Sequence, residues 1–313
     1  MTTLKKKVEF FGGGIHLGVP VKLTIKPSKK FGIFFRRTDL PNSDLIPARF
    51  DNVGDTKMRN TTIGDLSGAH VKTVEHLMAA LFIAGINSAI VEIAGPETPI
   101  LDGSAKEFLD AFIKAGATKG MHRKIIVRRE VSVSAREALR QVPFFTRMKI
   151  LFMNFVSGRK MNGFVKLGPS DNNALNIDAT LVYKEPVIGT QSFSYSFDGG
   201  KKSVNDFIKN VARARTFGKY SEWEYLKAHG MGRGANENNV IALNDAGDGT
   251  LNKVFWKNEF VRHKIIDAVG DMFTSQGFVV GNLTSYKGSH AMNNLVLRKL
   301  FSNSDNYEII DEK

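Results

Sequence analysis

The sequence predicts an α+β protein built from two domains, and three observations support this. The chain has 313 residues, and since folded domains hold roughly 100–200 residues each, two domains are expected. The first third of the chain alternates strand-like and helix-like runs in the order strands, helix, strand, helix, which is typical of helices that cover one face of a sheet. A helix, a glycine and a strand recur in that order in the second half, which indicates a similar unit there.

The opening of the chain has the pattern of short strands. Runs rich in β-branched and aromatic residues predict a strand over residues 6–11, a second over 19–25 and a third over 32–35. The glycines at 12–14 predict a tight hairpin turn between the first two strands. A loop that cradles a phosphate is the alternative interpretation of such a glycine run.

Two helices are predicted next, and each has a start and a stop signal. Thr73 is expected to cap a helix over residues 74–84, and Gly85 is expected to end it in a left-handed conformation. The remaining elements of this half are a strand over 89–93 and a helix over 105–115, which opens at Ser104 and ends at Gly116.

We place the domain boundary in the small-residue stretch 117–122. This predicts an N-terminal domain of residues 1–120 and a C-terminal domain of residues 121–313. Beyond the boundary, runs of strand-forming residues and apolar runs of helical period alternate. The predicted strands cover 124–133, 148–155, 177–183, 191–197 and 278–283, and the predicted helices cover 204–214, 260–273 and 293–301.

Composition excludes several classes of function. The sequence contains no cysteine, which rules out disulfides, Cys-ligated zinc, iron–sulfur clusters and Cys nucleophiles. The longest apolar runs fall well short of the roughly 20 residues that a membrane span needs. The N-terminus has basic residues but lacks the apolar core of a signal peptide. We therefore expect a cytoplasmic protein.

The net charge of +13 is concentrated in one part of the chain. Residues 121–170 carry 11 basic and 2 acidic residues, whereas residues 171–313 carry 17 of each. Such an excess indicates a polyanionic partner, namely nucleic acid, an anionic membrane surface or a phosphorylated substrate. The basic segment also holds Phe144, Phe145, Phe152 and Phe155, which we expect to be core residues of the predicted strands.

Two pairs of histidine and carboxylate residues have a spacing that suits catalysis. Glu75 and His76 are adjacent near a predicted helix start, where side chains diverge by about 100°, so that one can bind a metal while the other reaches a water. His263 and Asp267 are four residues apart and share a helix face, as a nitrogen and oxygen pair for zinc requires. Asp271 lies one turn further along. The alternative interpretation of the first pair is a partly exposed acid beside a core or capping histidine, and that of the second is a surface ion pair.

A third histidine, His290, follows a Gly-Ser turn at a predicted helix start. This position suits a catalytic acid, although a turn or cap residue is the alternative. The sequence contains no H-E-x-x-H motif, P-loop or Ser-His-Asp spacing. The spacing of these residues is compatible with metal-dependent chemistry of another kind, but by itself it does not favour that chemistry over the alternatives.

Seven sequence blocks occur together and in order over nearly the whole chain. They are GIHLG (14–18), VKTVEHLMAAL (71–81), PILDGSA (99–105), PVIGTQ (186–191), ARTFG (214–218), EFVRHKIID (259–267) followed by GD (270–271), and GSH (288–290). The ordered set resembles the UDP-3-O-acyl-N-acetylglucosamine deacetylase family, the zinc amidases of lipid A biosynthesis in Gram-negative bacteria.

The resemblance implies a fold and a metal site. The fold it implies has two similar domains of β-sheet and paired helices, with the active site between them and an insert of the second domain forming the acyl passage. The zinc ligands it implies are His76, His263 and Asp267, which leave a fourth position open for water. The implied substrate is UDP-linked, 3-O-acylated N-acetylglucosamine, and its acetyl group leaves as acetate.

The resemblance also implies a role for each remaining site residue. Glu75 is the general base. Thr216 and a cationic His290 stabilise the oxyanion together with zinc, and Asp271 keeps His290 protonated. Either Glu75 or His290 delivers the proton to the leaving amine. The residues expected to contact the substrate are Lys264, Phe217 and His16.

The partners expected from this assignment follow from charge. No stable nucleic-acid partner is expected, and a basic nucleic-acid-binding protein and an inactive scaffold remain the alternative classes. Residues 121–170 are expected to attract the nucleotide diphosphate or to make a transient contact with an anionic membrane surface. A merely solvated basic face is the alternative. The residues expected to act in this attraction are Arg123, Lys124, Arg128 and Arg129.

Overall fold

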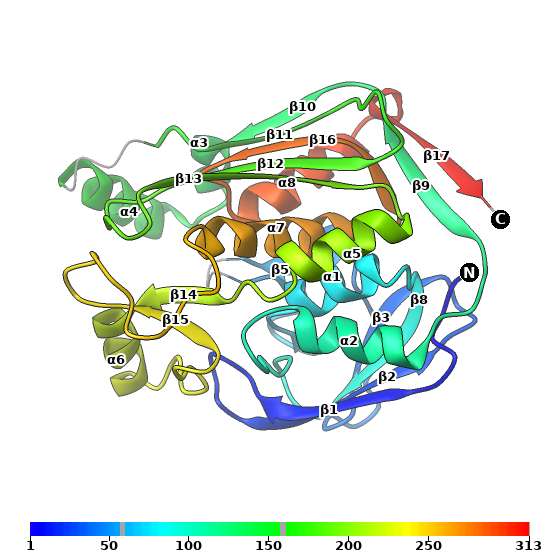
Figure 1. Ribbon diagram of the computed structural model, residues 1–313, viewed down its shortest axis with the longest axis horizontal. Coiled ribbons are helices and arrows are strands. Elements are labelled where there is room, and N and C mark those ends of the chain that lie inside the picture. Colours follow the sequence, from blue (N-terminus) through cyan, green and yellow to red (C-terminus); the bar gives the residue numbers. More distant parts are fainter. Residues whose placement is uncertain (57–59, 157–160, 313) are drawn as a thin grey trace.

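The computed structural model of the chain describes residues 1–56, 60–156 and 161–312. Two sheets enclose the central helices, so that the layers follow in the order sheet, helices, helices, sheet (Figure 1). The predicted α+β class is confirmed. No helix in the described ranges combines the length and the apolar character that crossing a bilayer requires.

The first sheet is built from the N-terminal third of the chain. Its strands, in spatial order, are β1 (Val8–Gly13), β2 (Pro20–Pro27), β8 (Ser88–Ile93), β3 (Gly32–Arg37) and β4 (Ile46–Pro47). Helices α1 (Glu75–Ile83) and α2 (Lys106–Ala115) follow in this half, and Phe108 and Phe112 of α2 pack against Phe10 of β1. A smaller sheet comprises β5 (Val53–Asp55), β6 (Thr62–Gly64) and β7 (His70–Val71), preceded by the short helix η1 (Phe50–Asn52).

The second sheet is built from the rest of the chain. Its strands, in spatial order, are β10 (Val131–Ser134), β11 (Phe164–Gly168), β16 (Phe278–Tyr286), β12 (Leu175–Val182) and β13 (Thr190–Phe197). Strand β9 (His122–Val127) pairs with β16 and with the C-terminal strand β17 (Tyr307–Glu312). The helices of this half include α5 (Lys201–Asn210), α7 (Glu259–Met272) and α8 (His290–Phe301), and the short helices η2 (Phe273–Ser275) and η3 (Ser304–Asn306) precede β16 and β17.

Two excursions leave the second sheet and project toward the same end of the molecule (Figure 1). One consists of α3 (Ala135–Arg140) and α4 (Phe144–Val156) between β10 and β11. The other consists of β14 (Thr216–Lys219), α6 (Tyr220–Ala228) and β15 (Val240–Leu243), in which the two strands pair in parallel.

The repeated outline predicted from the sequence is present. Helix α1 ends at Gly85, whose φ is +70°, and leads into β8, while α7 leads through η2 into β16. Each of these strands has a parallel neighbour in its own sheet, β3 for β8 and β12 for β16.

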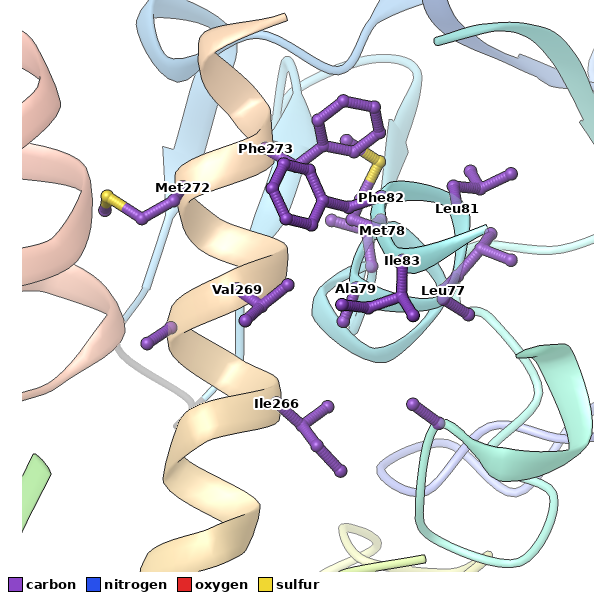
Figure 2. Packing of buried hydrophobic residues seen from close by; sticks show 14 of the residues in the cluster. Leu77, Met78, Ala79, Leu81, Phe82, Ile83, Ile266, Val269, Met272 and Phe273 are labelled. Atoms are coloured by element: carbon purple, nitrogen blue, oxygen red, sulfur yellow. The ribbon is translucent and has the colours of Figure 1, made fainter. Parts of the chain in front are cut away.

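Helices α1 and α7 pack closely at the centre of the molecule. Figure 2 shows Ile266 and Val269 of α7 facing the apolar side chains of α1, and the ring of Phe82 lies 5.3 Å from that of Phe273. A Cβ atom at Gly270 would lie 2.0 Å from the carbonyl oxygen of Glu75. Only a glycine permits this approach, which brings the first turn of α1 against the last turn of α7.

The predicted strand over residues 148–155 is wrong, because this segment lies within helix α4. The run, MKILFMNF, has a single β-branched residue, and its Met, Leu and Lys residues suit a helix. The expected core positions are wrong as well, since Phe144, Phe145 and Phe152 are 59%, 85% and 68% exposed. The side chain of Phe155 lies outside the described residues.

The basic residues at the start of the second sheet have partners. Arg123 lies 2.9 Å from Asp311, Lys124 lies 2.7 Å from Glu312, and Arg129 lies 3.1 Å from Asp305. Arg128 pairs with Glu308. These contacts join β9 to the C-terminal segment, at the end of the molecule away from β14 and β15 (Figure 1). The expected attraction of a nucleotide by these four residues therefore lacks structural support.

Candidate active site

Helices α1 and α7 bring together the three residues expected to bind a metal. One nitrogen or carboxylate oxygen from each of His76, His263 and Asp267 lies within 4.8 Å of the others, and all three side chains are buried. Asp267 Oδ1 lies 3.6 Å from His76 Nε2 and 3.4 Å from His263 Nε2. The two imidazole rings meet edge to face at 4.9 Å.

Neighbouring groups prepare these atoms for a metal. His263 Nδ1 donates to the carbonyl of Ala214 at 3.0 Å, so the lone pair lies on Nε2. Burial lowers the pKa of His263 to about 3, which keeps its ring neutral. Lys264 Nζ donates to Asp267 Oδ2 at 2.7 Å and leaves Oδ1 facing the histidines. Two imidazoles and a carboxylate are a donor set that fits zinc.

The carboxylate of Asp267 stays charged although it is buried. Burial by itself favours the protonated form, but the charge of Lys264, together with that of His290, outweighs it and holds the pKa of Asp267 well below its usual value. A charged carboxylate is the form that binds a cation.

Glu75 lies directly before His76 and is 3% exposed. Burial raises the pKa of its carboxyl, and the charges of His290 and His76 offset part of that rise. The backbone N–H of Thr61 donates to Glu75 Oε2 at 2.9 Å and fixes the orientation of the carboxyl. The group is therefore a positioned acid and base with a pKa shifted toward neutral pH.

His290 opens helix α8 and is held by Asp271. Its Nδ1 donates to Asp271 Oδ2 at 2.8 Å, while Nε2 lies 3.8 Å from Asp267 Oδ2. Burial opposes a charge on the ring, but the nearby carboxylates of Asp271 and Asp267 raise the pKa of His290 to about 9. His290 is therefore a cation at neutral pH.

Two residues that the sequence analysis did not single out complete the support of Asp271. The Thr61 hydroxyl donates to Asp271 Oδ1 at 2.6 Å and lies 3.3 Å from His290 Nδ1, and the Asn293 amide donates to Asp271 Oδ2 at 2.9 Å. Asn293 lies one turn beyond His290 on α8, and this spacing is a signal in the sequence that could have identified Asn293 as a site residue. Thr61 has none, because it lies in a short polar run and reaches the site only through tertiary packing.

Phe217 and Lys264 lie beside the metal-binding group. The Phe217 ring lies 5.0 Å from Phe260 and 6.4 Å from the ring of His263, and Lys264 Nζ lies 5.8 Å from the Phe217 centroid. Thr216 precedes Phe217 in β14, and its N–H donates to the carbonyl of Gly103 at 3.0 Å. The strand therefore borders the site along one side.

His16 lies in the β1–β2 connection, where Glu97 is the organising residue. The buried Glu97 carboxylate accepts the N–H of His16 at 2.9 Å and that of Leu17 at 3.0 Å. It also accepts the hydroxyl of Thr73 at 3.0 Å. None of the contacts in the described parts of the chain joins His16 to the metal-binding group. The amides that a bound phosphate would use are thus taken by Glu97.

Thr73 does not cap α1, which corrects the expectation from the sequence. The residue before the helix is Val74, and Thr73 adopts a φ of +58°. Its hydroxyl faces Glu97 instead, and its carbonyl accepts the hydroxyl of Thr98. The segment is therefore held by buried side chains from the loop before α2 rather than by a local cap.

A pocket opens beside these groups. The residues that line it include Lys264 and Asp267 of α7, His290 and Asn293 of α8, and Thr180 and Leu181 of β12. The lining therefore combines polar side chains with the apolar side chains of Ala179 and Leu181 from β12.

The fold and this site define an α+β metal-dependent hydrolase, in which a carboxyl and a cationic imidazole flank a His-His-Asp group. The chain belongs to the UDP-3-O-acyl N-acetylglycosamine deacetylase family, LpxC, whose sequence model matches residues 1–302. The family resemblance is confirmed. The chain is accordingly a hydrolase that deacetylates UDP-3-O-acyl-N-acetylglucosamine in lipid A biosynthesis.

Proposed function

We propose that His76, His263 and Asp267 hold the zinc ion of this deacetylase. The carrying observation is that the three ligand atoms lie within 4.8 Å of one another in a buried site, with Glu75 next in sequence to one ligand. Bound zinc supplies Lewis-acid polarisation of the acetamide carbonyl and lowers the pKa of a water molecule.

The buried carboxyl and imidazole then perform the proton transfers. Glu75 takes a proton from the water whose oxygen attacks the acetamide carbonyl carbon. His290, as a cation, stabilises the negative charge that develops on the carbonyl oxygen, and Asp271 keeps the imidazole protonated. The C–N bond breaks after the C–O bond has formed, a proton passes from Glu75 or His290 to the nitrogen, and acetate and the free amine leave.

The residues around this centre orient the substrate. We propose that the Thr216 hydroxyl also stabilises the developing oxyanion. Lys264 contacts polar groups of the substrate, Phe217 lines the sugar or acyl path, and His16 makes a secondary contact from the β1–β2 connection. The positions of Phe217 and Lys264 beside His263 support their part of this assignment.

We also propose a division of the chain into two domains. Residues 1–120 form the first domain and residues 121–313 the second, and the excursion formed by β14, α6 and β15 is the insert that forms the acyl passage. Its own apolar cluster supports this, with Trp223, Ala235, Val240 and Ala242 packed together. We further propose that the protein acts in the cytoplasm and has no stable nucleic-acid partner.

Metal analysis combined with an activity assay tests the proposed site. We expect purified protein to contain about one zinc per chain, and acetate release from the UDP-linked acylated substrate to stop after chelation and to return when zinc is added. Full acetate release from thoroughly chelated protein would reject the zinc assignment.

A further inference from the structure

Helix α4 presents an apolar stripe to solvent instead of to the core. Phe144, Phe145, Met148, Leu151 and Phe152 are each between 40% and 85% exposed. They are five of the fifteen large apolar side chains that the described residues expose, although they occupy only nine consecutive positions. A cluster of this density on a surface helix points to an interaction site.

The stripe lies on one face and is bordered by cations. At about 100° per residue, the five positions fall within an arc of about 120°. Arg147 and Lys149 fall about 40° outside its two borders. An apolar face with basic residues on both sides is typical of helices that lie in a membrane interface, where the long cationic side chains reach the lipid headgroups.

Most of the basic residues around α4 that the structure describes form no ion pair, the exception being Lys166, which pairs with Glu130 at 3.1 Å. Between Glu137 and Asp171 the sequence has six basic residues and no acidic one. Among the described residues, Arg136, Arg140, Arg147 and Lys149 form no ion pair, whereas the basic residues of β9 are paired with the C-terminal segment. The excess positive charge is therefore complementary to an anionic surface and repels a second copy of the same helix.

Helix α4 is connected to the segment that borders the pocket. Lys287 Nζ donates to Asn162 Oδ1 at 2.9 Å, and the Phe164 ring stacks on that of Tyr286 at 5.7 Å. Tyr286 and Lys287 directly precede the pocket residues Gly288, Ser289 and His290. A surface bound by α4 would lie at the end of the molecule where β14, which borders the site, is also found (Figure 1).

We propose that α4 docks this enzyme onto an anionic lipid bilayer, with the apolar stripe among the headgroups and Arg147 and Lys149 on lipid phosphates. The proposal depends on the surface of α4 and not on the assignment of individual catalytic residues. Docking would let an acylated substrate or product exchange with the bilayer close to the pocket.

Vesicle co-sedimentation of the full-length protein tests the docking. We expect binding to phosphatidylcholine vesicles that contain phosphatidylglycerol, weaker binding to phosphatidylcholine alone, and release by high salt. The Phe152→Trp variant should show a blue shift of its added tryptophan fluorescence with the anionic vesicles. Absence of binding to anionic vesicles would overturn the proposal.

Matched variants separate α4 from the rest of the surface. The double variant Phe145→Ser, Phe152→Ser and the charge reversal Arg147→Glu, Lys149→Glu should each bind anionic vesicles about tenfold more weakly or worse. The controls are Phe11→Ser, which removes a β1 side chain that is 69% exposed, and Lys201→Glu, Lys202→Glu at the exposed start of α5. Both should bind like the native chain.

Activity on a detergent-dispersed substrate verifies that each variant is folded, since α4 supplies no residue to the site. Vesicle binding that survives both α4 variants would overturn the proposal. Another contrary outcome is a native chain that fails to bind vesicles but associates with itself or with RNA. If that association disappears in the α4 variants, the stripe belongs to that other partner and the proposal of membrane docking is overturned.

Discussion

At the scale of single residues, the site separates metal binding from proton transfer. His76 and Glu75 are neighbours in sequence, yet one faces Asp267 and the other is held by the Thr61 amide. Because adjacent positions on a helix diverge, a single first turn of α1 can supply both functions.

The first prediction separates these functions by substitution. His76→Ala and His263→Ala should each lose zinc and activity, because a ligand nitrogen is removed. Glu75→Ala should keep zinc and lose deacetylation by about a hundredfold or more. Zinc content and acetate release are measured on the same samples, and full zinc occupancy in both histidine variants would refute the assigned site.

The second prediction concerns pH. His290 is cationic below its pKa of about 9, so activity should decline as the pH rises through that value. In Asp271→Asn the neighbouring charge is lost and the pKa of His290 falls, so the decline should start at lower pH. The pH dependence of kcat/KM in both proteins is the measurement. If kcat/KM declines over the same alkaline pH range in the variant as in the native protein, His290 is not the essential cation.

The third prediction assigns Thr61 as a positioning residue. Thr61→Val removes the hydroxyl bound to Asp271 but keeps the amide bound to Glu75. We expect kcat to fall about tenfold, with KM and zinc content nearly unchanged, because a buried charge-assisted hydrogen bond is lost. Thr61→Ser keeps a hydroxyl and should restore the rate. If the serine variant is as slow as the valine variant, the hydroxyl is not the relevant group.

At the scale of elements, the crossing of α1 and α7 decides whether the ligands meet. The fourth prediction is that Gly270→Ala lowers the free energy of unfolding by about 1–3 kcal/mol, because the added methyl would press on the Glu75 carbonyl. Zinc affinity should fall with it, since the two helices carry different ligands.

The matched control for this crossing is Gly168→Ala in β11. A Cβ there meets its nearest neighbour at an ordinary 3.7 Å, so stability and zinc affinity should change little. Denaturant unfolding and zinc titration of both variants are the measurements. A Gly270→Ala protein with native stability and zinc affinity would show that the helices can move apart without consequence.

Helix α4 shows where local patterns mislead. Its apolar run has no turn signal and no clear strand alternation, so short-range patterns do not distinguish an exposed helix from a core strand. Ser134 and Glu137 form a capping box, but it marks the start of the preceding helix α3 and not that of α4. The exposed stripe that results is visible only once the neighbours of α4 are known.

At the scale of the whole molecule, the C-terminal segment that pairs with β9 supplies acidic partners for Arg123, Lys124, Arg128 and Arg129 of the basic segment. The fifth prediction is that neutralising Arg123, Lys124, Arg128 and Arg129 together leaves KM unchanged and lowers Tm modestly, because exposed ion pairs contribute about 0.2–1 kcal/mol each. Thermal unfolding and steady-state kinetics are the measurements. A large rise in KM that high salt abolishes would instead place these residues on the path of the nucleotide.

The sequence by itself determined the α+β class and most central strands and helices, and it predicted the residues that we propose to carry the chemistry. Glycines that end helices, strand-forming runs and the four-residue spacing of His263 and Asp267 are local signals, so they can be recognised in the sequence. The family blocks occur in a fixed order along the chain, which identifies the site residues within them. Only the tertiary structure decided that Gly270 admits the Glu75 carbonyl, that Thr61 joins Glu75 to Asp271, that Glu97 occupies the amides near His16, and that α4 is exposed. Each of these depends on groups that are distant along the chain and meet only after the two sheets have enclosed the helices, because local patterns carry no information about which distant surface a residue will face.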